Sequence, residues 1–136
     1  MKINSNDEIV RRFRKKNYDK YEGLYYCEAL HDDNEGFRII LEHESGKGPL
    51  LKVTFGKFLA YRNIDESNRL KLWNEHKDIA EKHTFYEVEN SIWVKWFVNE
   101  NKGKYESSEI KHYMILTSQD VIEVLSYDEP QIEEVF

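Results

Sequence analysis

A histidine and a glutamate near the C-terminal end of the chain are the residues whose types and spacing best suit chemistry. Residues 109–127 predict a β-hairpin whose turn is Thr117–Asp120. In that register Met114 lies opposite Glu123, and His112 lies one diagonal step away on the same face. A histidine beside a carboxylate pairs with it by charge or takes part in proton transfer.

Two interpretations of this pair remain open. The structural one is a satisfied polar contact beneath a loop or helix, and it is the more common situation for buried polar groups. The functional one is a pocket in which His112, Tyr113 and Glu123 form a polar site with Arg62. The second interpretation predicts a cavity beside the strand that carries the histidine.

Other candidate residues carry weaker signals. His31, Asp32, Asp33 and Glu35 are zinc or manganese ligand types, but neighbouring turn residues rarely converge on one ion. We interpret them as a solvated turn. Cys27 lies in a predicted strand and is interpreted as a small buried hydrophobe. The chain has no phosphate-binding glycine loop, nucleophile elbow, HExxH or CxxC motif, so we expect no metal, no cofactor and no catalytic residue.

The first half of the chain predicts one helix followed by a sheet. Ser5 or Asn6 is a suitable helix cap, and the basic run 11–16 lies toward the C-terminal half of the helix, where the macrodipole favours cations. Gly56 is interpreted as a bulge within the last strand of the sheet. The expected three-stranded antiparallel meander consists of residues 23–30, 37–43 and 50–62.

The second half predicts two helices and the hairpin. Residues 65–82 have helical periodicity, and residues 85–88 form a short strand candidate. Ser91 is a suitable cap for an aromatic helix, although the segment after it fits a strand nearly as well. Together these elements predict an α+β fold, with one antiparallel sheet of five or six strands covered by two or three helices.

Length and composition indicate a single folded domain. The chain has 136 residues, of which 40% are hydrophobic, so we expect one domain over residues 1–136. The single cysteine cannot form an internal disulfide, and no apolar segment approaches the length of a signal peptide core or a membrane span. We therefore expect a cytoplasmic protein without membrane association. Residues 128–136 are an acidic tail whose order stays open.

Charge is distributed unevenly along the chain. The first 20 residues have a net charge of +4 and the last 20 a net charge of −6, within a total of −6. The acidic total disfavours general binding to a nucleic acid backbone, although a basic N-terminal helix remains an alternative. An acidic surface suits a basic protein partner. The candidate partner-binding residues are Asp32, Asp33, Glu35, Asp120, Asp128, Glu129, Glu133 and Glu134.

The C-terminal third resembles a group of small bacterial proteins that accompany polymorphic toxin systems. The resemblance lies in NSIWVKWF at 90–97, EIKHYMILTSQDVIEVLS at 109–126 and DEP at 128–130. Val121 departs from the group, which has a small residue or cysteine there. The matching positions are Ser91, Trp96, His112, Tyr113, Thr117, Asp120, Glu123, Leu125, Ser126 and Pro130.

The resemblance implies an immunity protein, which inhibits a cognate toxin by binding it. Toxins that act on phosphate-containing substrates have basic clefts, and an acidic inhibitor suits such a cleft by charge complementarity. We therefore expect a non-enzymatic binding protein. The alternatives are a small enzyme or ligand-binding domain around His112 and Glu123, and a nucleic acid binder that uses the basic N-terminal segment.

Overall fold

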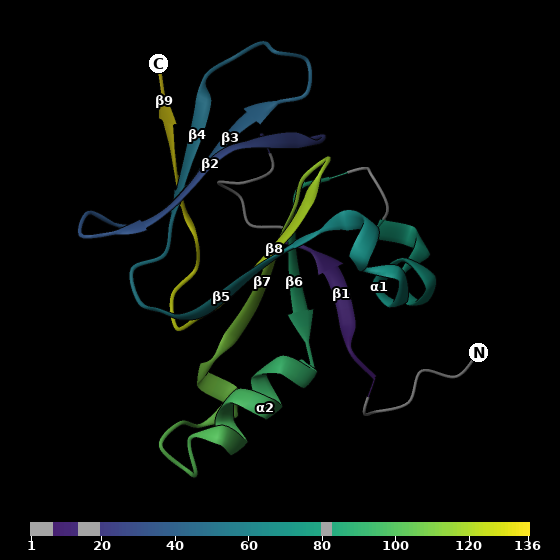
Figure 1. Cartoon of the computed structure of the whole chain (residues 1–136), viewed down its shortest axis with the longest axis vertical. Helices are drawn as coiled ribbons and strands as arrows, with labels where there is room; N and C mark the ends of the chain where they lie inside the picture. Colours follow the sequence, from purple (N-terminus) through teal and green to yellow (C-terminus); the bar gives the residue numbers. More distant parts are fainter. Residues whose placement is uncertain (1–6, 14–19, 80–82) are drawn as a thin grey trace.

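The computed structural model describes residues 7–13, 20–79 and 83–136, which form two antiparallel sheets and two α-helices (Figure 1). Sheet A consists, in spatial order, of β1 (Ile9–Arg12), β6 (Phe85–Glu89), β7 (Lys111–Leu116), β8 (Asp120–Ser126) and β5 (Phe58–Asp65). Sheet B consists of β2 (Tyr25–Asp33), β3 (Gly36–His43), β4 (Leu50–Thr54) and β9 (Gln131–Val135). The helices are α1 (Leu70–Glu75) and α2 (Ile92–Glu100), with the short 3₁₀ helices η1 (Glu66–Asn68), η2 (Lys77–Ile79) and η3 (Ser107–Glu109).

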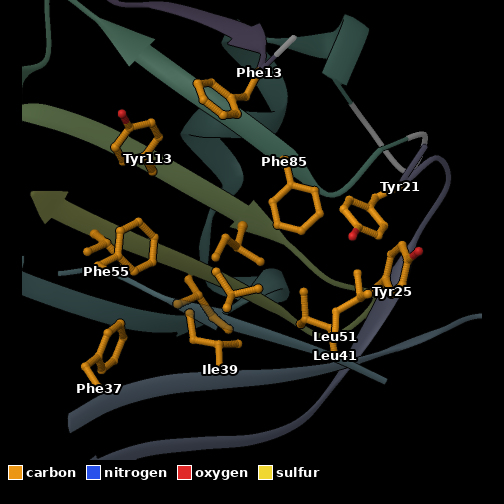
Figure 2. Packing of buried hydrophobic residues seen from close by; sticks show 14 residues of the cluster. Phe13, Tyr21, Tyr25, Phe37, Ile39, Leu41, Leu51, Phe55, Phe85 and Tyr113 are labelled. Atoms are coloured by element: carbon orange, nitrogen blue, oxygen red, sulfur yellow. The ribbon is translucent and has the colours of Figure 1, made fainter. Parts of the chain in front are cut away.

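The main core lies between the two sheets. Ile39 and Leu41 of β3 are fully buried there and pack in one cluster with Ile115 of β7 and Ile122 of β8. Figure 2 shows Ile39, Leu41 and Leu51 close to aromatic rings of the same cluster. Burial of these apolar surfaces is the main stabilising contribution to such a sandwich.

The opposite face of sheet A is covered by the helices. Met114 and Leu116 of β7 pack with Leu72 of α1, whereas Leu125 of β8 packs with Val94 of α2. Both faces of β7 and β8 are therefore buried, which explains why these strands are apolar at nearly every position. The predicted hairpin and its register are confirmed, because Met114 pairs with Glu123.

The prediction of an α+β fold is confirmed, but the expected single sheet is wrong. Residues 50–62 do not form one strand, because the chain turns at Gly56 and Lys57. β4 before this turn belongs to sheet B, and β5 after it belongs to sheet A. The segment therefore connects the two layers of the sandwich.

The predicted N-terminal helix is also wrong over the described residues. Residues Ile9–Arg12 form the edge strand β1, which pairs with β6. Val10 packs beneath the α1 side of sheet A, whereas Phe13 packs in the core between the sheets. Val10 and Phe13 are three positions apart, so on a strand their side chains lie on opposite faces. Both faces of sheet A are buried here. The proposed caps Ser5 and Asn6 and residues 14–16 lie outside the described residues.

The helix expected over residues 65–82 is divided into η1, α1 and η2, and residues 80–82 lie outside the described part. Arg69 interrupts it with a φ of −122° and a ψ of 43°, and His76 ends α1 in a similarly non-helical conformation. By contrast, the helix capped by Ser91 is confirmed as α2. Within the described residues, no helix has the length and apolar character needed to cross a membrane.

Candidate functional site

A buried carboxylate forms the centre of a polar network on the helix-covered face of sheet A. Glu123 of β8 is 1% exposed, and its Oε2 atom accepts hydrogen bonds from Arg62 Nε at 2.7 Å and Arg69 Nη1 at 2.6 Å. Its Oε1 atom accepts a hydrogen bond from His112 Nε2 at 2.9 Å. The carboxylate is thus neutralised by two guanidinium groups and fixed by three donors, as a buried charge requires.

Strand order explains how these side chains meet. β8 lies between β7 and β5, so Glu123 has His112 on one neighbouring strand and Arg62 on the other. Arg62 is directly opposite Glu123 in the ladder, and His112 is diagonal to it. Arg69 is the residue immediately before α1, and its backbone conformation is not helical.

Ser91 extends the network to helix α2. Its Oγ atom lies 2.7 Å from His112 Nδ1 and accepts a hydrogen bond from the Val94 amide at 3.0 Å. An ionised Glu123 requires the proton of a neutral imidazole to be on Nε2, so Nδ1 is then the acceptor for the Ser91 hydroxyl. The order of proton donation is therefore Ser91 to His112 to Glu123.

Trp93 covers the network on the side of α2. The Arg62 guanidinium lies 4.4 Å from the centre of the Trp93 ring, in a cation–π contact. The edge of the same indole contacts His112, with the ring centres 5.3 Å apart. The network thus ties α2 to the middle of sheet A through polar and aromatic contacts.

The environment of Glu123 sets its ionisation. Burial by itself raises the pKa of this carboxyl group, but hydrogen bonds from His112 and Arg62 outweigh burial and hold the pKa at about 2. Glu123 is therefore ionised at neutral pH.

Acid should weaken the fold through this residue. The folded pKa of about 2 is below the ordinary value of 4.5, so the contribution to stability is complete above pH 5 and disappears as the pH falls toward 2. The difference corresponds to about 3 kcal/mol. Urea unfolding of the wild type and of Glu123→Gln from pH 7 to pH 2 should show stabilities that converge on acidification. A difference that stays constant over this range would contradict the assignment.

Ser91→Ala should destabilise the protein by about 2 kcal/mol, because it removes a helix cap and leaves His112 Nδ1 without its hydroxyl partner. Thermal and urea unfolding measure this loss. The matched control is Ser107→Ala, at an exposed serine in η3, which should change stability by less than about 0.5 kcal/mol. Equal stability of the two variants would show that the Ser91 contacts are energetically unimportant.

A cavity of about 470 Å³ lies beside the network. Ser91 and His112 are part of its wall, and Glu123 and Arg62 are not. Lys95, Lys111 and the serines of η3 contribute polar surface around it. The volume lies in the range of small-molecule sites.

The structure separates Tyr113 from the polar network, although Tyr113 and Phe13 line the same cavity as His112. The Tyr113 ring points into the core between the sheets, where it makes an edge contact with Phe13 at 5.4 Å and packs against Phe55 at 5.8 Å. Residues next to each other on a strand point to opposite faces, so Tyr113 and His112 point in opposite directions. Ser91 and Arg69 complete the network instead, and no short motif in the sequence indicates either contact.

The acidic candidates fall into three regions, and the largest group lies at one end of sheet B. Asp32, Asp33 and Glu35 lie at the tip of the β2–β3 hairpin, and the β8–β9 connection with Asp128 and Glu129 reaches the same end of sheet B. Arg38 holds Asp33 through contacts of 2.7 and 3.2 Å.

The other acidic candidates lie elsewhere. Glu133 and Glu134 are in β9, opposite Lys52 and Leu51 of β4. Asp120 lies in sheet A, where it pairs with Asp65.

The described residues contain no group of three or more histidine, cysteine, aspartate and glutamate side chains that could hold a metal ion. Burial raises the pKa of the Cys27 thiol, so the thiol is mainly protonated at neutral pH. Neither His31 nor Cys27 has contacts that indicate chemistry.

Comparison with protein-family models, curated proteins and solved structures found no match to this chain. The geometry and charge of the chain itself are therefore the observations from which a function can be proposed.

Proposed function

We propose that this chain is a cytoplasmic binding protein whose acidic half docks onto a basic protein partner by a non-enzymatic interaction. In its most specific form, the partner is a bacterial toxin and the chain is the immunity protein that covers the toxin's basic active-site cleft. The separation of charge between the two halves of the fold is the observation that supports the proposal.

The whole net charge of −6 belongs to the part of the chain that builds sheet B. Residues 20–57 and 128–136 contain eleven carboxylates and five lysine or arginine side chains, a net charge of −6. The rest of the chain contains fifteen of each and is neutral. Segments far apart in the sequence thus combine into one acidic layer, because β9 pairs with β4. Such a layer attracts a basic surface and speeds its association.

Acidic side chains crowd this layer closely enough to affect one another. The pKa of Glu42 is raised by a hydrogen bond with Glu28 on the neighbouring strand and by the charge of Glu28. In contrast, the hydrogen bonds from Arg38 hold the pKa of Asp33 at about 2 and fix its orientation at the hairpin tip. A basic partner would relieve the repulsion and find part of the surface already ordered.

The resemblance of residues 90–97 and 109–130 to proteins of polymorphic toxin systems supports the more specific form of the proposal. An immunity protein needs a stable scaffold and a complementary surface, and no catalytic group is required for it. A toxin with a basic substrate cleft has the charge that the acidic layer fits.

The test is co-expression with the toxin-sized domain encoded beside the gene for this chain, together with titration calorimetry of the purified pair. Asp32→Lys combined with Glu35→Lys should weaken binding by at least about tenfold at low salt, with a smaller effect at high salt. The matched control is Glu75→Lys with Glu106→Lys, at exposed positions of the neutral half, which should leave the affinity within about twofold. Failure of the domain to bind, or equal losses in both double variants, would contradict the proposal.

A further inference from the structure

The cavity beside helix α2 has a serine, a histidine and a carboxylate arranged in series. Ser91 Oγ lies 2.7 Å from His112 Nδ1, and His112 Nε2 lies 2.9 Å from Glu123 Oε1. This is the order of a nucleophile, a general base and the group that orients the base. In the usual arrangement Nε2 faces the serine and Nδ1 faces the carboxylate, whereas here Nδ1 faces the serine and Nε2 faces the carboxylate. The order of the three groups is the same.

The carboxylate selects the form of histidine that a base requires. Because Glu123 accepts from Nε2, the neutral ring has an unprotonated Nδ1 directed at the Ser91 hydroxyl. Glu123 itself is held in place by Arg62 and Arg69, so the ring orientation is fixed. Ser91 also accepts the Val94 amide hydrogen, and this bond at the start of α2 stabilises negative charge on Oγ.

Ser91 and His112 both line this cavity, and they are 5% and 3% exposed, so only a small part of each is open to it. Lys95, Ser107 and Ser108 give the remaining wall a polar character.

We propose that Ser91 is an activated nucleophile that reacts with small polar carboxylic esters in this cavity. Oγ forms a bond to the carbonyl carbon, and its proton passes to His112 Nδ1 and then to the departing alkoxide as the ester C–O bond breaks. Water then attacks the acyl group and gives a proton to His112, and the carboxylic acid leaves while Oγ regains its proton. This activity is separate from the binding function, which depends on the acidic half of the fold.

The test uses diisopropyl fluorophosphate on the full chain, followed by mass spectrometry of its peptides. Ser91 Oγ should bond to phosphorus with loss of fluoride, at a rate at least about tenfold above that of any other serine. Ser91→Ala should remove the adduct, and Ser118→Ala, at an exposed serine of the β7–β8 turn that does not line the cavity, should retain it. His112→Gln should lose labelling while Ser91 is still present. Absence of an adduct in the wild type, or an adduct at another serine only, would overturn the proposal.

Ester hydrolysis separates nucleophilic chemistry from a purely structural network. The wild type should hydrolyse p-nitrophenyl acetate with a burst of p-nitrophenol that Ser91→Ala lacks. Hydrolysis that is equal in both proteins would overturn the proposal without affecting the proposed partner binding.

Discussion

Glu123→Ala should lower the free energy of unfolding by about 3 to 5 kcal/mol. The substitution leaves the guanidinium groups of Arg62 and Arg69 close together without the carboxylate between them, and removes the acceptor of His112 Nε2. A buried ion pair adds little compared with an apolar replacement, but removal of one partner leaves a charge uncompensated. Urea unfolding at pH 7 measures the loss.

The control for this experiment is Glu133→Ala on the exposed surface of β9, which should change stability by less than about 0.5 kcal/mol. Glu123→Gln keeps the shape and one acceptor oxygen, so it should cost less than the alanine variant. A loss below about 1 kcal/mol for Glu123→Ala would show that the network is not a stabilising feature of the fold.

Leu41→Ala should destabilise the protein by about 2 to 5 kcal/mol. Leu41 is fully buried between the sheets, so the shortened side chain leaves a cavity as well as losing apolar burial. Leu70→Ala is the chemically matched control, because Leu70 is 68% exposed at the start of α1. It should change stability by no more than about 0.5 kcal/mol.

These two leucines test where the core lies. A large effect at Leu41 together with a small one at Leu70 agrees with a core closed by sheet B. Similar effects at both positions, measured by urea unfolding, would contradict the layer arrangement.

The two proposals share Glu129, which belongs to the acidic layer and lines the cavity, but their other residues differ and they can fail separately. The binding proposal depends on charged side chains in the layer of sheet B, and Ser91 lies outside that layer. Ser91→Ala should therefore leave partner affinity unchanged, whereas reversal of charge at Asp32 and Glu35 should leave labelling of Ser91 unchanged. Calorimetry and mass spectrometry on the same variants distinguish the outcomes.

Local patterns predicted the part of the fold in which neighbours in sequence are neighbours in space. The hairpin around Thr117–Asp120 follows from its turn residues and from β-branched arms, and its register places His112 diagonal to Glu123. Ser91 was a predictable helix cap because its hydroxyl accepts an amide hydrogen of the first turn.

Tertiary structure decided the features in which partners are distant in sequence. Val10 and Phe13 fit a helix by spacing, but a strand with both faces buried accommodates them equally well, and pairing with β6 selects the strand. Gly56 looked like a bulge because nothing local indicates that the chain changes sheets there.

The same distinction applies to the candidate site. The sequence by itself determined that His112 and Glu123 share a strand-pair face, and that the chain is acidic at its C-terminal end. Only the tertiary structure joined Arg69 and Ser91 to that pair and collected the negative charge into the layer of sheet B. The physical reason is that a buried carboxylate requires hydrogen-bond donors, and these come from residues that are distant in sequence. Short-range patterns do not indicate which distant residues the fold brings close.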